Sequence, residues 1–192
     1  MKAKVYKLLR MIPVIGAIFR IANAYAYEGR AEGNIYVAPF RMWWGRIFKK
    51  MVFILLFTEM LVLINGQLLL DWSWEPADTI FSVFPSVLGF GIGVFALMFV
   101  MPSNFLQFLK DRRGTLSFGP EIVPVDMGYP LVVFVLVIVS AAINKIFPNG
   151  FLRFISVWAF FYGLAMAFEL ISFLFNTSYL IHKINEDNNE KS

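Results

Sequence analysis

Two acidic residues, Glu59 and Glu169, lie inside stretches that are otherwise apolar enough to be membrane helices. An ionised carboxylate is costly in hydrocarbon, so each group needs a partner or must be neutral. At 1.5 Å per residue, both lie roughly 9 to 15 Å from the cytoplasmic end of the predicted helix. If the two helices are neighbours, within or between subunits, the carboxyl groups can share a proton. This arrangement predicts a proton relay or a cation site.

A second interpretation of both glutamates is structural. A protonated glutamic acid can hydrogen-bond across helices, and the candidate partners are Asn65, Gln67, Ser172 and backbone carbonyl groups. The sequence leaves both interpretations open.

Other reactive chemistry is nearly absent from the chain. There are no cysteines and one histidine, His182, which excludes thiolate chemistry and histidine-rich metal sites within one subunit. Ser, His and Asp form no recognised catalytic arrangement, and no phosphate-binding loop is present. We therefore predict a protein that is not an enzyme, with no catalytic residue, metal or cofactor.

Small residues recur four positions apart in two of the apolar stretches. Gly89 and Gly93 share one helix face, and Gly163 and Ala167 repeat the spacing. Such pairs let a second helix backbone approach closely. They favour helix association, either with another span of the chain or with a second subunit in a homo-oligomer.

The composition predicts that lipid surrounds these helices. Hydrophobic residues make up 59% of the 192 residues, too many for an ordinary soluble domain of this size. Four stretches approach the roughly 20 apolar residues that a membrane helix needs: 51–70, 79–101, 130–147 and 151–175. We predict an all-α membrane protein with four transmembrane helices arranged as two hairpins, in a domain that covers residues 51–182.

The distribution of basic residues predicts the orientation. Ten of the 17 Lys and Arg residues precede residue 51, three lie in the loop 102–129, and two lie in the tail. Cytoplasmic loops retain positive charge, so we predict a multi-pass protein of the inner (plasma) membrane with both termini in the cytoplasm. The positive charge therefore reflects topology, and we expect no direct binding of nucleic acid.

Three segments outside the spans have separate predictions. In residues 1–50 we predict an amphipathic helix that is divided near Pro13 and Gly16. This helix lies either on an anionic leaflet or against the rest of the protein. Arg20 interrupts the apolar run and opposes a signal peptide. The loop 102–129 predicts a short amphipathic helix over 104–113 and a small hairpin involving 115–118 and 122–125. Residues 183–192 predict a disordered tail.

Basic residues near the predicted cytoplasmic surface are candidates for contacts with lipid or with a partner. They are Arg46, Lys49, Lys50, Lys110, Arg112 and Arg113. These side chains can hold anionic headgroups, bind a soluble protein or simply fix the topology. The three alternatives remain open.

Part of the second span and the residues that follow it resemble a known pattern. Residues 84–97, FPSVLGFGIGVFAL, and 105–109, FLQFL, are similar to small multi-span bacterial proteins encoded in defence islands, such as the membrane component of the Kiwa phage-defence system. The resemblance implies a homo-oligomeric membrane sensor or scaffold that works with a cytosolic DNA-binding protein. It carries no functional residue over to this chain.

Together these observations predict a non-enzymatic, homo-oligomeric component of the inner membrane. It would act as a sensor or scaffold with a cytosolic partner, in bacterial defence if the resemblance holds. The alternative is a pore that conducts ions or protons along Glu59 and Glu169.

Overall fold

The structure is a computed structural model of the whole chain that describes residues 6–7, 10–66, 69–97 and 122–189. Within these ranges the regular structure is entirely helical, which confirms the all-α prediction. The long helices are α4 (Lys49–Asn65), α5 (Pro76–Leu97), α7 (Val123–Ile146) and α8 (Gly150–Asn189). Shorter elements are α2 (Ile15–Ala26), η1 (Ala31–Asn34), α3 (Phe40–Trp43), the π-helix η2 (Trp44–Phe48) and η3 (Leu69–Asp71).

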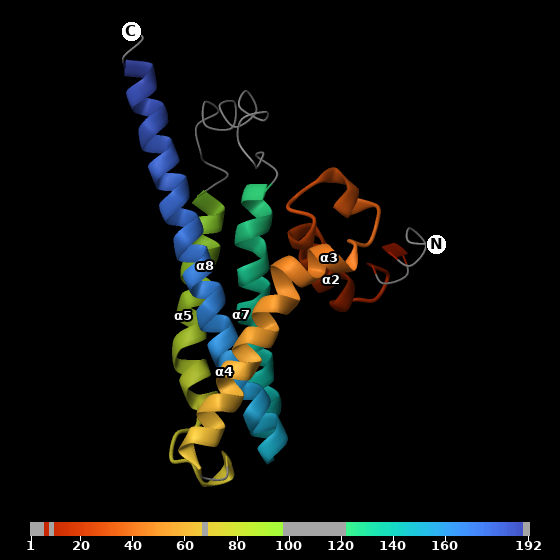
Figure 1. Cartoon of the computed structure of the whole chain (residues 1–192), viewed down its shortest axis with the longest axis vertical. Coiled ribbons are helices and arrows are strands. Elements are labelled where there is room, and N and C mark those ends of the chain that lie inside the picture. The colour runs from red at the N-terminus through yellow and green to blue at the C-terminus, as the bar shows by residue number, and fades with distance from the viewer. Residues whose placement is uncertain (1–5, 8–9, 67–68, 98–121, 190–192) are drawn as a thin grey trace.

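Helices α5, α7 and α8 form a bundle whose core consists of side chains such as Ile80, Phe84, Phe134 and Met166. The long helices run between two ends (Figure 1). At the lower end, called here the connector end, residues 66–75 and 147–149 join successive helices. The upper end, called here the cluster end, carries the C-terminal part of α8 (Figure 1).

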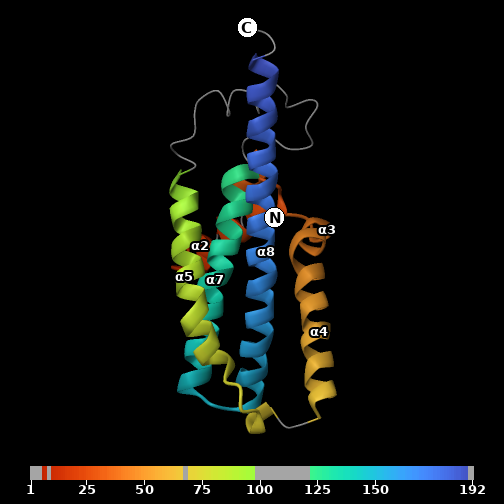
Figure 2. The same cartoon turned by 90° about the vertical axis from the view of Figure 1, so that its left-hand side faces the viewer.

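Helix α4 lies on the side of α8 away from α5 (Figure 2). The indole Nε1 of Trp158 donates to the carbonyl oxygen of Met51 at 3.2 Å, and the rings of Phe57 and Phe161 meet edge to face. Helices α4 and α5, the members of the first predicted hairpin, are successive in the chain, but α4 packs mainly on α8. The pairing of α4 with α5 is therefore not confirmed.

Three of the described helices are long and apolar enough to cross a membrane: Pro76–Leu97, Val123–Ile146 and the Gly150–Ser178 part of α8. They correspond to the second, third and fourth predicted spans and are typical of a multi-pass membrane protein. The first predicted span is shorter than expected. Helix α4 ends at Asn65, rather than at residue 70, because Gly66 adopts a left-handed conformation (φ 65°) that terminates it.

Helix α7 begins earlier than the predicted third span. It starts at Val123 with Pro124 in its first turn, where proline is favoured because the missing N–H has no helical partner. Residues 123–125 are therefore helical, and the predicted hairpin strand over 122–125 was wrong. Pro130, the predicted start of the span, lies inside the helix instead. The short helix predicted over 104–113 and the strand over 115–118 lie outside the described residues.

Helix α8 continues well past the predicted end of the fourth span. It runs without a break to Asn189, about 16 Å beyond Ser178 at 1.5 Å per residue. The predicted disordered tail, 183–192, is therefore helical through residue 189.

The residues before α4 form a compact unit, called here the N-terminal unit, that covers residues 15–48 and packs through α2 against α7. The break predicted near Pro13 lies just before α2, which starts at Ile15. The buried side chain of Asn23 holds the unit together. Its Nδ2 donates to the carbonyls of Gly33 and Tyr36, and its Oδ1 accepts from the N–H of Ala38, at 2.8 to 2.9 Å.

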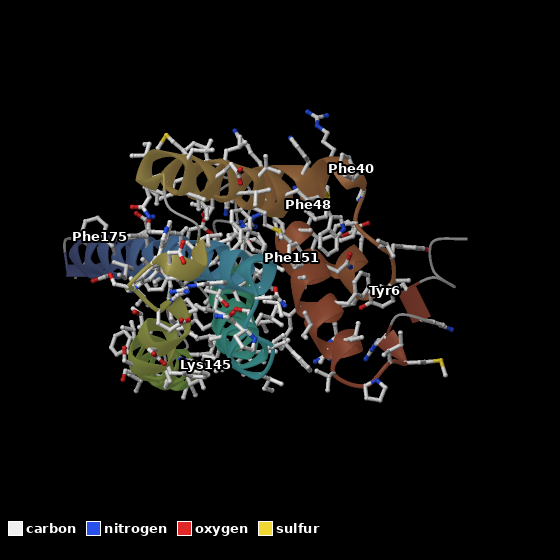
Figure 3. All side chains as sticks on the ribbon, turned by 90° about the horizontal axis from the view of Figure 1, so that it is seen from below. Tyr6, Phe40, Phe48, Lys145, Phe151 and Phe175 are labelled. Carbon is white, nitrogen blue, oxygen red and sulfur yellow. The ribbon has the colours of Figure 1, made fainter. Side chains whose placement is uncertain are left out.

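The N-terminal unit projects to one side of the long helices. Viewed along the bundle, Tyr6 and Phe40 lie on that side, away from Phe175 on α8 (Figure 3). Of the two arrangements expected for this segment, packing on the protein itself is observed for the part that includes α2.

Candidate functional site

The phenol of Tyr25 lies where the N-terminal unit meets the long helices. Lys50 Nζ donates to the Tyr25 hydroxyl at 2.9 Å, and that hydroxyl donates to Glu169 Oε2 at 2.9 Å. Lys50 also forms an ion pair with Glu169 Oε1. The three groups therefore tie α2, α4 and α8 together at one point.

Two further side chains contact the Tyr25 ring. The guanidinium carbon of Arg46 lies 4.2 Å from its centroid, and the ring of Tyr129 stacks at 4.2 Å with an interplanar angle of 11°. Arg46 Nη2 also donates to Asp126 Oδ1 at 2.7 Å, and Tyr129 shares a 2.9 Å hydroxyl contact with Tyr162. These contacts bring α7 into the same junction.

Local helix geometry explains why these side chains converge. Arg46 and Lys50 are four residues apart in one continuous helix, and Asp126 and Tyr129 are three apart near the start of α7. Residues at such spacings share a helix face. The two faces point toward Tyr25, which is only 2% exposed. We call Tyr25, Arg46, Lys50, Asp126 and Glu169 the Tyr25 cluster.

The Tyr25 cluster pairs two cations with two carboxylates, so its ionised side chains are balanced. Burial, and then the negative charge of Glu169, raise the pKa of Tyr25 well above its usual value near 10. The phenol therefore remains neutral and can donate its hydrogen bond to Glu169. A cavity of about 260 Å³ adjoins the cluster, and Ser172 and Asn176 complete its polar lining.

The cluster differs from the carboxylate pair expected from the sequence. Glu169 is bound by Lys50 and Tyr25, whereas Glu59 is exposed on α4 and has no hydrogen bond or ion pair with any described residue. Glu59 lies nine residues beyond Lys50, about 13 Å further along the helix. The two glutamates therefore do not meet within one chain, although α4 and α8 are neighbours as supposed.

Of the predicted polar partners of the glutamates, Ser172 lines the cavity beside the Tyr25 cluster, and the other described side chains are not gathered there. Asn65 is exposed at the far end of α4, and Gln67 lies outside the described residues. Among the basic candidates, Arg46 and Lys50 belong to the Tyr25 cluster and Lys49 is exposed beside it. Lys110, Arg112 and Arg113 lie in a part of the chain that the structure does not describe.

The glycines divide into packed and open positions. A Cβ on Gly163 would lie 2.4 Å from Phe84, so this residue allows the close approach predicted for it, and Ala167 packs at the edge of the same core. Gly89 and Gly93 face open space within the chain. Gly91, between them, makes the close contact instead, because a Cβ there would lie 2.5 Å from Leu131.

A second polar cluster, at the connector end, was not predicted. Arg153 Nη2 donates to the carbonyls of Trp72 and Trp74 at 2.9 and 2.8 Å and lies 3.5 Å from Glu75 Oε2. Asn144 Nδ2 also donates to Glu75 at 3.3 Å. The signal that could have marked Arg153 is its position as a basic residue within an apolar helix.

Neither cluster has the composition of a metal centre. Within the described residues, no group of three or more His, Asp or Glu side chains could hold a metal ion. The Tyr25 cluster has hydrogen-bond donors paired with acceptors, an arrangement that can fix one element against another. It contains no activated nucleophile.

Comparison of the chain with protein-family models, curated proteins and solved structures finds no match.

Proposed function

We propose that the chain is a non-enzymatic inner-membrane protein with four spans and cytoplasmic termini, which acts as a homo-oligomeric sensor or scaffold for a cytosolic partner. The supporting observation is the fixed attachment of the N-terminal unit to α4, α7 and α8 through Tyr25. A change in that unit is therefore mechanically coupled to helices that continue through the bundle.

The positions of the connections support the same proposal. The described chain leaves the bundle at Leu97 and re-enters at Ile122, both at the cluster end, where α8 also extends to Asn189 (Figures 1 and 2). Among the described residues, the connector end carries short segments that include 69–75 and 147–149. A soluble partner would therefore dock at the cluster end, where the N-terminal unit and the C-terminal part of α8 lie (Figure 1).

Helix α4 is the proposed first span. Its 17 residues extend about 26 Å, close to the thickness of the hydrocarbon core, and it continues upstream through η2 and α3. Phe53, Leu56 and Leu63 are 65 to 71% exposed, as expected for side chains that face lipid.

The topology can be tested directly because the chain has no cysteine. Single cysteines replacing Asn34 in the N-terminal unit and Ser73 at the connector end should react from opposite sides of the membrane with an impermeant maleimide. We expect Asn34→Cys to react only after the membrane is opened and Ser73→Cys to react in intact cells with a permeable outer membrane. Reaction of both from one side would contradict the proposal.

The partner can be tested by photo-crosslinking in cells. Ile35 in the N-terminal unit and Phe147 at the connector end are both exposed apolar residues, at 55% and 62%. A photoreactive residue at position 35 should crosslink to a specific cytosolic protein, whereas the matched probe at position 147 should not. Light scattering of the purified protein should show more than one copy per particle, and a monomer without the crosslink would contradict the proposal.

The resemblance to the Kiwa membrane component adds phage defence to the proposal. If the chain acts in defence, deletion of its gene should raise the number of phage plaques on the host, and re-expression should lower it again. Unchanged plaque numbers across a diverse phage panel would remove this part while leaving the scaffold role intact.

One observation favours the alternative function of a pore. Glu59 is an exposed carboxylate on an apolar helix and has no partner within the described residues, so in an oligomer several copies could line a polar path. Flux of protons or cations into liposomes that Glu59→Gln abolishes would support the pore. Since Glu169 is held by Lys50 and Tyr25, Glu169→Gln would leave such flux largely unchanged.

A further inference from the structure

A groove of about 610 Å³ runs between the start of α4 and the middle of α8, beside the Tyr25 cluster. One end is lined by Trp44, Gly45, Lys49 and Lys50, and the other by apolar residues that include Phe53, Leu56 and Ala165. Lys49 and Leu56 are seven residues apart, about 10 Å along the helix axis. The groove therefore changes from basic to apolar along its length.

The basic end carries a net positive charge. Lys50 shares its charge with Glu169, the one acidic residue in the lining. Lys49 is exposed and has no ion-pair partner within the described part of the chain. One cation therefore remains for a ligand, at the level where Trp44 would meet the membrane surface.

From this distribution we propose that the groove binds one anionic phospholipid. An acyl chain lies against Phe53, Leu56 and Ala165, and the phosphate lies at Lys49 and Lys50. The inference rests on the proposed placement of α4 in the membrane. It adds a ligand to that proposal, because the lipid would contact the helix and the ion pair that hold the N-terminal unit.

The adjoining polar cavity provides space for the remainder of the headgroup. It shares Lys50 and Glu169 with the groove, and it is also lined by the polar side chains of Arg46, Ser172 and Asn176. Hydroxyl and phosphate oxygens of a headgroup would find hydrogen-bond partners among these side chains.

A second copy of the chain fits the groove less well than a lipid. A membrane helix packed along the groove would cover Lys49 with apolar side chains and leave its charge unpaired, which is unfavourable. A phospholipid has its anionic group at one end and its hydrocarbon at the other, in the same order as the groove. Charge complementarity therefore favours the lipid.

The proposal can be tested by native mass spectrometry of the purified, delipidated protein, titrated with phosphatidylglycerol or with zwitterionic phosphatidylethanolamine. We expect one phosphatidylglycerol per chain to bind in preference to phosphatidylethanolamine. Lys49→Gln should reduce that preference about fivefold, since a basic residue near an anionic surface contributes about 1 kcal/mol. Arg41→Gln, an exposed basic residue outside the groove, is the matched control and should have no effect.

A second variant tests the apolar end. Ala165→Phe should reduce occupancy by either lipid, provided that circular dichroism and thermal unfolding match the wild type. Equal binding of both lipids to the wild type, or an unchanged preference in Lys49→Gln, would overturn the proposal. A change in oligomeric state in Ala165→Phe, with lipid binding intact, would also overturn it and assign the groove to a subunit interface.

The same preparation separates this inference from the proposed function. A cysteine replacing Phe53 should be shielded from an impermeant maleimide in proteoliposomes if α4 lies in the membrane. Reaction at that position would refute the membrane placement and the lipid site with it. Shielding without a preference for phosphatidylglycerol would refute the lipid site alone.

Discussion

Both ends of the helix bundle carry networks of arginine or lysine with carboxylates, but the two networks join different parts of the chain. At the connector end, Arg153 of α8 binds the carbonyls of Trp72 and Trp74, which belong to the segment between α4 and α5. At the cluster end, Tyr25 joins the N-terminal unit to α4, α7 and α8. The first network holds a connecting segment against the bundle, and the second attaches the N-terminal unit to it.

The cations of the two ion pairs differ in burial. The side chain of Arg153 is 10% exposed and that of Lys50 is 30% exposed, whereas their carboxylate partners, Glu75 and Glu169, are similarly exposed at 33% and 35%. When a charge is more completely removed from water, the loss of its partners destabilises the protein more strongly. The connector end should therefore be the more rigid anchor, and the cluster end should be the one that can be released without unfolding the bundle.

The largest expected effect is at Arg153. Arg153→Met should lower the free energy of unfolding by roughly 3 kcal/mol, because the carbonyls of Trp72 and Trp74 and the carboxylate of Glu75 lose their common donor. Thermal unfolding in detergent, followed by circular dichroism, measures the change.

Lys145→Gln serves as the control for the connector end. Lys145 pairs with Asp78 at 2.9 Å, but both side chains are well exposed, so the melting temperature should barely move. If Arg153→Met were as stable as this control, the connector end would not be an anchor, and the comparison between the two ends would fail.

An intermediate effect is expected at Glu169. Glu169→Gln should lower the free energy of unfolding by about 1 to 3 kcal/mol, because Lys50 and Tyr25 lose a charged acceptor in a partly buried site. Glu59→Gln is the matched variant in the other apolar helix. Glu59 is exposed without a partner in the described structure, so the variant should unfold as the wild type does. Equal effects at both positions would show that the loss of a carboxylate charge, rather than the loss of the cluster contacts, decides stability.

The contrast between these two glutamates shows what could be predicted from the sequence. The length of the apolar stretches located three of the described helices. The presence of an acidic residue in one of these stretches marked Glu169 as a candidate functional residue. Its partner Tyr25 is 144 residues away in the chain, on a helix whose position on lipid or on protein the amphipathic pattern could not decide. Long-range contacts of this kind depend on packing and have no local signal.

Helix ends were predicted less well than helix interiors, for reasons that differ from one end to the next. Gly66 stops α4 before the apolar run is finished, since one left-handed residue ends a helix regardless of hydropathy. Helix α7 begins at Val123, with Pro124 in its first turn, before the predicted span begins at Pro130. Asp126 thereby enters the first turn of α7, where it meets Arg46, and this contact was missed because residues 123–125 were taken for a strand.

The smallest expected effect, and the most specific, is at the Tyr25 hydroxyl. Tyr25→Phe keeps the ring that stacks on Tyr129 and lies beside Arg46, and it removes only the group between Lys50 and Glu169. Since Lys50 and Glu169 remain paired, the free energy that holds α2 in place should fall by only about 1 kcal/mol. It should appear as faster amide hydrogen exchange in α2.

Exchange at the connector end distinguishes local release from general weakening. In Tyr25→Phe, amides of α2 should exchange about fivefold faster, the equivalent of 1 kcal/mol, while amides near Arg153 should keep the wild-type rate because the two networks share no residue. Arg153→Met should instead raise exchange in α5, α7 and α8 together. If Tyr25→Phe accelerated exchange equally at both ends, the N-terminal unit would be part of the cooperative bundle, and the contrast drawn between the two ends would be wrong.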